Sequence, residues 1–234
     1  MISLKGRTAL ITGGGRGLGR AIANILNEAG ADIVVVDLAK TLGDTTLPSD
    51  WQHLALDLVS ADAERELTDY ISSLSGLDIL IANAGVVPPW SSIETLDFSE
   101  WERTFALNVR AVAASLKAAA PHLAASTHGS AVITASLVSH RAYPGMALYT
   151  SSKHAVLGLM RAAALDMGQD GVRVNALAPG PILTDAMRGR IQARAEAGGP
   201  DEATAIAAMN AETALGRVAT ETDVARAACF LARR

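Results

Sequence analysis

A tyrosine and a lysine one helical turn apart open a long helical pattern in the second half of the chain. Residues 149–153 read YTSSK, and the i, i+4 spacing puts the Tyr149 phenol and the Lys153 ammonium on one helix face. A free tyrosine has a pKa of about 10 and is a poor base at neutral pH, but a nearby cation favours the phenolate. We predict that Lys153 lowers the pKa of Tyr149, which then exchanges a proton with an alcohol or ketone. Taken alone, the same spacing is more typical of an exposed surface pair.

A glycine cluster follows the first short apolar run. Residues 8–11 suit a strand buried on both faces, and residues 12–19 read TGGGRGLG, which is T-G-x-x-x-G-x-G and not the G-x-G-x-x-G fingerprint. Glycines allow a tight turn and a close approach of the backbone to a diphosphate. A helix that begins near Leu18 offers free N–H groups and the positive end of its dipole to that anion. The order of strand, glycine turn and helix therefore predicts a dinucleotide site.

An aspartate ends the second apolar run, residues 32–37. At this position the Asp37 carboxylate would accept hydrogen bonds from the adenosine ribose hydroxyls and repel a 2′-phosphate, which favours NAD over NADP. Arg16 and Lys40 argue the other way, because either one could pair with a phosphate. NADP therefore stays as the alternative cofactor.

Apolar runs and helical patterns alternate along the chain, which is typical of a parallel sheet with helices on both faces. The predicted strands cover 8–11, 32–37, 51–56, 77–82, 130–134 and 172–177, and the predicted helices cover about 18–30, 61–75, 98–119 and 148–167. Because no linker or repeat interrupts this order, we expect an α/β chain with one doubly wound Rossmann-like domain over 1–234. The Ala-rich, polar segment 184–216 departs from the alternation. We predict that it is a substrate lid, with a solvated helix pair as the alternative.

The composition excludes several other classes of protein. The 234 residues are 50% hydrophobic and 19% charged, as in a folded globular chain, and the formal net charge of −4 gives no general attraction to nucleic acid. The single cysteine, Cys229, cannot form an internal disulfide, and no Cys/His cluster has metal-ligand spacing. No signal peptide opens the chain, and no apolar run reaches the roughly 18 residues that span a bilayer. We expect a cytoplasmic protein with a small-molecule substrate, no metal, and neither a nucleic-acid nor a membrane partner.

Six ordered motifs together resemble the short-chain dehydrogenase/reductase family over nearly the whole chain. They are a glycine motif, an acidic residue and leucine after the third strand, N-A-G after the fourth, an asparagine in the next helix, a serine before the tyrosine, and P-G-x-x-x-T after the sixth strand. In this sequence they are Gly13, Gly17 and Gly19; Asp57 and Leu58; Asn83, Ala84 and Gly85; Asn108; Ser136; and Pro179, Gly180, Ile182 and Thr184.

The resemblance implies a role for each catalytic residue. Tyr149 is the acid/base, and Lys153 binds the nicotinamide ribose and lowers the tyrosine pKa. Ser136 stabilises the substrate oxygen. Asn108 positions a water that connects Lys153 to solvent.

The resemblance also implies a set of cofactor contacts, in which Ile182 and Thr184 hold the carboxamide of the nicotinamide. The predicted NAD-binding residues are Gly13, Arg16, Gly17, Leu18, Gly19, Asp37, Asp57, Leu58, Asn83, Ala84, Gly85, Tyr149, Lys153, Pro179, Gly180, Ile182 and Thr184.

The substrate pocket is expected between the N-A-G motif, the catalytic serine and the lid. Trp90, His140 and Tyr143 are the predicted substrate residues, although packing for Trp90 and a loop surface for His140 are equally good interpretations. Arginines 188, 190 and 194 could attract an acidic substrate, but a solvated helix face is the favoured interpretation.

These observations predict an oxidoreductase that transfers a hydride between NAD(H) and a secondary alcohol or ketone of the sugar, polyol or cyclic alcohol class. The alternatives are an NADPH-dependent 3-oxoacyl-type reductase, which Arg16 favours, and a non-catalytic NAD-binding regulator or scaffold. The resemblance implies a homo-oligomer, either a tetramer or a dimer. Relatives continue past the helix that contains Phe230 into a seventh strand, which is absent from this sequence. A real loss would expose the edge of the sixth strand, but an incomplete sequence is the favoured explanation.

Overall fold

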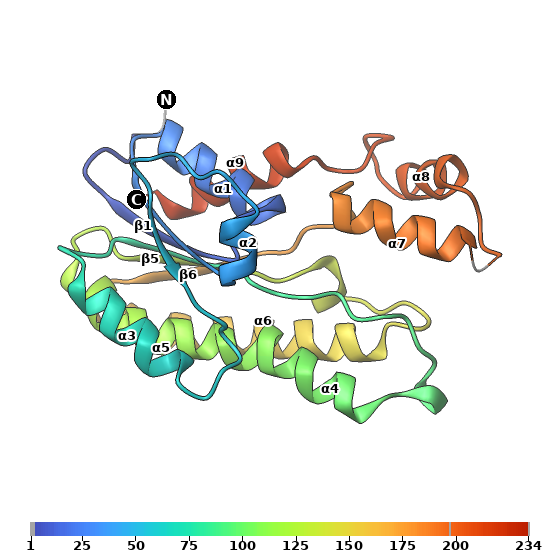
Figure 1. Ribbon diagram of the computed structural model, residues 1–234, viewed down its shortest axis with the longest axis horizontal. Coiled ribbons are helices and arrows are strands. Elements are labelled where there is room, and N and C mark those ends of the chain that lie inside the picture. Colours follow the sequence, from blue (N-terminus) through green and yellow to red (C-terminus); the bar gives the residue numbers. More distant parts are fainter. Residues whose placement is uncertain (1–2, 197, 234) are drawn as a thin grey trace.

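Six parallel strands form one sheet in the computed structural model, which describes residues 3–196 and 198–233 (Figure 1). The strand order is β3-β2-β1-β4-β5-β6. The strands are β1 (Thr8–Thr12), β2 (Asp32–Asp37), β3 (Gln52–Ala55), β4 (Ile79–Ala82), β5 (Ser130–Thr134) and β6 (Arg173–Leu177). The direction of winding reverses between β1 and β4, and ligands bind at such a point beyond the carboxyl ends of the strands.

Helices cover both faces of the sheet (Figure 1). The helical elements are α1 (Gly17–Glu28), α2 (Ala39–Gly43), α3 (Ala63–Ser73), η1 (Ile93–Thr95), α4 (Phe98–Phe105), η2 (Ala106–Arg110), α5 (Ala111–Ala125), η3 (Leu137–Ser139), α6 (Ala147–Gly168), α7 (Asp185–Glu196), α8 (Glu202–Ala211) and α9 (Glu221–Ala232). Helices α1 and α9 pack on one face, and α3, α5 and α6 pack on the other.

The apolar strands are buried on both sides because successive side chains point to opposite faces. In β2, Val34 and Val36 join the core under α3 and α5, whereas Ile33 and Val35 join the core under α1 and α9. All four side chains are buried. A strand with both faces covered is a continuous apolar run in the sequence, which explains why the strands could be found without an alternating pattern.

The predicted fold class is confirmed: the chain is a single α/β domain with a parallel sheet. The main difference lies in the helix predicted over 98–119, which the structure divides into α4, the π-helical segment η2 and α5. This π-helical segment contains Asn108. The wider turn of a π-helix changes the spacing of side chains, so a 3.6-residue pattern does not reveal it. Helix α2 was not predicted, and no strand follows α9 among the described residues.

The end of α9 is tied to β6 by an arginine. Arg173 Nη1 donates to the carbonyl oxygen of Leu231 at 2.8 Å, and its Nη2 donates to Ser130 Oγ at 3.1 Å. A guanidinium at a helix C-terminus satisfies carbonyl groups that have no partner within the helix. Within the described part of the chain, no helix is long and apolar enough to span a membrane.

Segment 184–216 leaves the sheet as helices α7 and α8, which lie beyond α9 in Figure 1. Its base is closed by a parallel bridge between Ile182 and Ala219. The two helices are joined by an ion pair between Arg188 and Glu202. The segment is therefore a helix pair, and its action as a substrate lid stays a prediction.

Candidate active site

The turn between β1 and α1 can be formed only with glycine at several positions. Gly13 and Gly17 have φ angles of +65° and +54°, in the left-handed region that side chains with a Cβ rarely adopt. A Cβ atom on Gly19 would lie 2.0 Å from the carbonyl oxygen of Gly13. The turn and the first residues of α1 are therefore in close backbone contact, as a cradle for a diphosphate requires.

The N-terminus of α1 has free hydrogen-bonding capacity. Arg16 is the N-cap residue, but its side chain makes no capping hydrogen bond, and the first turn of α1 contains no acidic residue. The first N–H groups of a helix have no partner within the helix and favour anions. The cradle therefore fits a dinucleotide diphosphate. Leu18 is partly buried and packs against the core beneath the cradle.

Asp37 is fixed beside the glycine turn by two backbone groups. Gly15 N donates to its Oδ2 at 2.9 Å, and Leu38 N donates to its Oδ1 at 2.8 Å. A carboxylate accepts about four hydrogen bonds, so acceptor capacity remains for hydroxyl groups. Arg16 and Lys40 are exposed, and neither forms an ion pair with Asp37 among the described residues.

The residues after β3 differ in what they offer to a ligand. Asp57 is exposed, and its Oδ1 accepts a hydrogen bond from Val59 N at 3.1 Å. Leu58 is buried in the core under α3 and α5. The Asp57 carboxylate is therefore accessible at this edge of the sheet, whereas the side chain of Leu58 is not.

Asn83 joins the ends of three neighbouring strands. Its backbone N–H donates to Thr12 Oγ1 at 3.0 Å, its Nδ2 donates to the carbonyl oxygen of Gly13 at 3.3 Å, and its Oδ1 accepts from Thr134 Oγ1 at 3.2 Å. Ala84 N also donates to Thr12 Oγ1, at 3.1 Å. These bonds hold the start of the glycine turn against the ends of β4 and β5.

Asn108 is fully buried, and its carboxamide is occupied by the protein. Its Oδ1 accepts from Val86 N at 2.8 Å, and its Nδ2 donates to Val86 O at 2.9 Å and to Ser152 Oγ at 3.1 Å. A Cβ on Gly85 would lie 3.1 Å from Asn108 Oδ1 and 3.7 Å from Lys153 Nζ. The two Nδ2 protons of Asn108 thus bind the loop after β4 and a side chain of α6, and the amide holds these two segments together. Its predicted contact to a water stays a prediction.

Ser136 and Tyr149 are brought together by the loop after β5. Ser136 is the N-cap residue of η3, and its N–H donates to Ser139 Oγ at 3.2 Å. Ser139 Oγ in turn donates to the carbonyl oxygen of Lys153 at 2.8 Å, which attaches this loop to α6. Tyr149 stands in the first turn of α6, close enough to Ser136 for the serine side chain to counteract part of the rise in the tyrosine pKa. The predicted serine and tyrosine therefore face one another.

Burial controls the charge of both members of the tyrosine–lysine pair. Burial raises the pKa of Tyr149, while the Ser136 side chain and the positive charge of Arg190 act in the opposite direction. Lys153 Nζ lies 5.9 Å from the centroid of the Tyr149 ring. Without a bound cofactor, loss of hydration of the phenolate outweighs the effects of Ser136 and Arg190. Burial also lowers the pKa of Lys153 to about 8. The predicted lowering of the Tyr149 pKa by Lys153 beside a nicotinamide stays a prediction.

The segment after β6 passes close to the loop after β5. Leu137 N donates to the carbonyl oxygen of Pro179 at 2.8 Å, and a Cβ on Gly180 would meet the Leu137 side chain at 4.0 Å. Ile182 packs against the core under α1 and α9. Thr184 Oγ1 accepts from Met187 N at 3.1 Å and so caps α7. Ile182 and Thr184, the predicted carboxamide contacts, thus lie between the end of β6 and the start of α7.

The three predicted substrate residues are spread around the rim of the site. Trp90 is 54% exposed, and the guanidinium carbon of Arg194 lies 4.9 Å from its ring centroid. Tyr143 Oη donates to Glu212 Oε2 at 3.4 Å, so it faces the end of α8 and not Tyr149. His140 is exposed, and its ring has no hydrogen-bond partner among the described residues.

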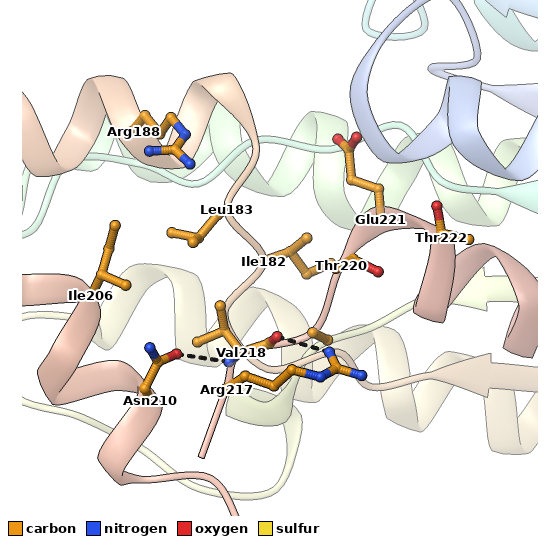
Figure 2. A pocket seen from close by; sticks show the side chains of 11 residues that line it. Ile182, Leu183, Arg188, Ile206, Asn210, Arg217, Val218, Thr220, Glu221 and Thr222 are labelled. Carbon is orange, nitrogen blue, oxygen red and sulfur yellow. Dashed lines mark hydrogen bonds between the residues drawn. The ribbon is translucent and has the colours of Figure 1, made fainter. Parts of the chain in front are cut away.

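A cavity of about 480 Å³ lies between α7, α8 and the start of α9 (Figure 2). It is lined by Ile182, Leu183, Arg188, Ile206, Asn210, Arg217, Val218, Ala219, Thr220, Glu221 and Thr222. Glu221 Oε1 would lie 3.8 Å from a Cβ on Gly17. Burial and the nearby Asp185 raise the Glu221 pKa. A carboxyl group that the sequence motifs did not indicate therefore flanks the anion cradle.

Comparison with known proteins identifies the family. A family model described as enoyl-(acyl carrier protein) reductase matches residues 13–234. Short-chain dehydrogenase reductase 4 of Arabidopsis thaliana is 38% identical over 191 residues, which cover 77% of this chain and 63% of that protein. The chain is a short-chain dehydrogenase/reductase. In the structure of this short-chain dehydrogenase/reductase, no group of three metal-ligating side chains occurs among the described residues.

Other relatives match this short-chain dehydrogenase/reductase over nearly its whole length. Cis-4-hydroxycyclohexanecarboxylate dehydrogenase of Sinomonas cyclohexanicum is 34% identical over 232 residues, 97% of this chain and 89% of that protein. The structure of carveol dehydrogenase from Mycobacterium avium in complex with NAD has a TM-score of 0.87 and 28% identity, and the match covers 100% of this chain and 93% of that one. A Beutenbergia cavernae protein, provisionally described as an NAD(P)-dependent gluconate 5-dehydrogenase, has bound NADP at low occupancy; the TM-score is 0.85 at 29% identity, over 99% and 91% of the two chains.

Proposed function

We propose that this short-chain dehydrogenase/reductase is an NAD-dependent oxidoreductase that interconverts a secondary alcohol and a ketone. The observation that carries the proposal is the placement of Tyr149 at the carboxyl end of the sheet. The Ser136 loop is attached to the same helix through Ser139 and Lys153. Lys153 Nζ lies 5.9 Å from the centroid of the Tyr149 ring. An uncapped helix N-terminus and a glycine turn lie at the same edge. A bound nicotinamide dinucleotide supplies the acceptor or donor of the hydride.

Each catalytic side chain has a separate task in this proposal. Tyr149 takes the hydroxyl proton of the alcohol, or returns a proton to the oxygen during ketone reduction. Ser136 donates a hydrogen bond to the same oxygen. Lys153 uses one ammonium proton for the Thr134 carbonyl, and its other protons would bind the ribose hydroxyls of the cofactor. The positive charges of Lys153 and Arg190 oppose the cost of burying a phenolate.

Asp37 supports NAD over NADP. Its carboxylate is held beside the glycine turn by Gly15 and Leu38 and has no cationic partner among the described residues. In this setting it would bind ribose hydroxyls and repel a 2′-phosphate. The NAD complex of carveol dehydrogenase supports this choice, and the NADP complex of the Beutenbergia cavernae protein keeps NADP as the alternative.

Cyclic secondary alcohols are the proposed substrate class. Two of the compared proteins have names that specify a cyclic alcohol, a hydroxycyclohexanecarboxylate and carveol. An acyl-type reductase is the second candidate, because the matching family model is described as an enoyl-(acyl carrier protein) reductase.

The proposal is tested with purified protein, NAD or NADP, and a panel of cyclic alcohols, sugars and polyols, by the absorbance of the reduced cofactor. We expect turnover of at least one cyclic alcohol, with NAD preferred. A 3-oxoacyl thioester with NADPH tests the second candidate in the same assay. If NAD binds in calorimetry but no member of either panel reacts, the non-catalytic regulator replaces this proposal.

A further inference from the structure

Helix α7 directs two arginines toward the catalytic end of the molecule. Arg190 and Arg194 are four residues apart in α7 and therefore share one face of the helix. The Arg194 guanidinium carbon lies 4.9 Å from the ring centroid of Trp90. Because Trp90 is in the loop after β4, this contact shows that the shared face of α7 points toward the loops at the carboxyl end of the sheet.

The Trp90 loop in turn lies against the segment that leads into the catalytic helix. Ser91 N donates to the carbonyl oxygen of Gly145 at 3.0 Å, and Ser91 forms a parallel bridge with Met146. A Cβ on Gly145 would lie 3.7 Å from Trp90 Cβ. Arg194 is thus connected through Trp90 to the residues just before Tyr149, and Arg190 stands one helical turn away on the same face.

Arg190 is close enough to Tyr149 for their charges to interact. Burial raises the pKa of Tyr149 and lowers that of Arg190, and the attraction between the guanidinium and a phenolate offsets part of both shifts. Arg190 is half-buried, and its guanidinium donates only to Met187 Sδ at 3.9 Å, a weak acceptor, among the described residues. The neighbouring Arg188 instead pairs with Glu202 in α8. Arg190 therefore differs from Arg188 in having no carboxylate partner within the described chain.

A half-buried guanidinium without a carboxylate partner is a suitable binding group for an anion. Its planar fork of N–H donors matches a carboxylate, with which it forms two parallel hydrogen bonds. No described carboxylate fills this place, which leaves the guanidinium open to a ligand. We propose that Arg190 binds a carboxylate group of the substrate, so that the enzyme prefers cyclic hydroxy acids and oxo acids to neutral alcohols. This inference rests on the proposed function for the reaction, but its binding step is independent of turnover.

The first test compares acids with neutral amides of the same shape. Wild type, Arg190→Met, Arg190→Lys and, as the matched control on the same helix, Arg188→Met are assayed with NAD on 3- and 4-hydroxycyclohexanecarboxylate and the corresponding amides. For the wild type we expect kcat/KM to be at least about tenfold higher for an acid than for its amide. Arg190→Met should lower kcat/KM for the acid by roughly 10–100-fold and for the amide by less than about threefold, since charged hydrogen bonds of this kind are strong.

The two controls separate charge and geometry from a general effect on α7. Arg190→Lys keeps the charge without the fork and should recover part of the preference for the acid. Arg188→Met should leave the ratio of acid to amide unchanged. Equal use of acid and amide by the wild type, or an equal loss for both with Arg190→Met, would overturn the inference.

A binding experiment distinguishes failure of this inference from failure of the proposed function. Cyclohexanecarboxylate is titrated by calorimetry into the protein with NAD present, and cyclohexyl phosphate serves as a second anion. We expect the carboxylate to bind and Arg190→Met to weaken its binding about tenfold or more. Carboxylate binding that depends on Arg190, without turnover of any alcohol, would remove the proposed function but keep the inference. Oxidation of neutral alcohols without Arg190-dependent carboxylate binding would keep the proposed function and overturn the inference. Tighter binding of the phosphate than of the carboxylate would also overturn the inference, whatever the turnover.

Discussion

Lys153 donates a hydrogen bond from Nζ to the carbonyl oxygen of Thr134, at 2.8 Å. The hydroxyl of Thr134 donates to Asn83 Oδ1 at 3.2 Å, and Asn83 Nδ2 donates to the carbonyl oxygen of Gly13 at 3.3 Å. This chain of contacts connects the lysine of the catalytic helix to the glycine turn through the ends of β5 and β4. The two regions proposed to hold opposite ends of the cofactor are therefore positioned by one hydrogen-bond network.

Substitution of Asn83 should impair the glycine turn and the lysine together. In Asn83→Ala, the bonds to Gly13 and Thr134 are lost, and we expect the dissociation constant for NAD to rise about tenfold and the free energy of unfolding to fall by about 1–3 kcal/mol. Calorimetry and urea denaturation measure the two effects. Thr134→Ser keeps the hydroxyl that donates to Asn83 and should resemble the wild type; an Asn83→Ala protein with unchanged NAD binding would contradict the network.

Lys153→Met should stabilise the protein at neutral pH while abolishing activity. Burial lowers the pKa of Lys153 from 10.5 to about 8. At pH values below 8, burying the charged lysine therefore lowers the free energy of unfolding by about 3 kcal/mol. Loss of the bond to Thr134 costs about 1 kcal/mol. We therefore expect the free energy of unfolding of Lys153→Met at pH 7 to be about 2 kcal/mol higher than that of the wild type.

The stability advantage of Lys153→Met over the wild type should decrease as pH rises. Because the folded pKa is lowered, the unfolded lysine binds more protons between pH 8 and 10.5, and the stability of the wild type relative to the variant should rise over that range. Urea denaturation at about pH 7 and pH 10 measures the difference. A Lys153→Met variant that is less stable than the wild type at pH 7 would show that the buried ammonium is fully compensated in the folded protein.

Asp37→Ala should shift the choice of cofactor toward NADP. Removal of the carboxylate removes acceptors for the ribose hydroxyls and the repulsion of a 2′-phosphate. We expect the ratio of kcat/KM for NAD to that for NADP to fall about 100-fold, mainly through weaker NAD binding. Asp57→Ala, which removes the carboxylate after β3, is the control, and we expect it to change this ratio less than Asp37→Ala does. An unchanged ratio in Asp37→Ala would mean that Asp37 does not contact the ribose.

Glu221→Gln should tighten dinucleotide binding at neutral and alkaline pH. Glu221 Oε1 lies 3.8 Å from the Cβ position of Gly17, so its negative charge opposes a diphosphate at the N-terminus of α1. Its pKa is raised by burial and by Asp185, so the carboxyl group becomes neutral at a higher pH than an ordinary glutamate. Wild type and Glu221→Gln should therefore bind NAD alike at acid pH and diverge as pH rises through the Glu221 pKa.

The stability of Glu221→Gln relative to the wild type should also increase with pH. A raised folded pKa contributes stability below the ordinary pKa of glutamate, and that contribution is lost as pH rises through the folded value. The variant should accordingly have the higher melting temperature at pH 8 and no advantage at pH 4. NAD affinities that stay equal at all pH values would place Glu221 outside the electrostatic reach of the cofactor.

Much of the fold was predictable because it depends on local patterns. The strand predicted over 130–134 has the bounds of β5, since a polar, glycine-containing loop precedes a short apolar run. The tyrosine and lysine could be placed on one helix face because that requires only the spacing of α6. The π-helical turn around Asn108 could not be predicted, because it departs from the regular periodicity on which a helix prediction relies.

Other parts of the site depend on long-range packing. Arg190 and Glu221 reach the site from α7 and α9, and no local motif marks either residue as part of it. The direction of the Tyr149 pKa also depends on how much water the folded chain excludes, which the spacing of Tyr149 and Lys153 does not contain. Sequence motifs thus indicated the proposed reacting groups, whereas their electrostatic surroundings required the structure.

The central claim is that Tyr149 moves the proton of the reaction, and one pair of variants tests it most directly. Tyr149→Phe is compared with Tyr70→Phe, which removes the hydroxyl of a partly buried tyrosine in α3, for kcat on an alcohol that the wild type oxidises and for the dissociation constant of NAD. We predict that Tyr149→Phe lowers kcat by about 10²–10⁴-fold with NAD binding unchanged, as expected for loss of a general acid/base, and that Tyr70→Phe resembles the wild type. A Tyr149→Phe enzyme with wild-type kcat would contradict the account.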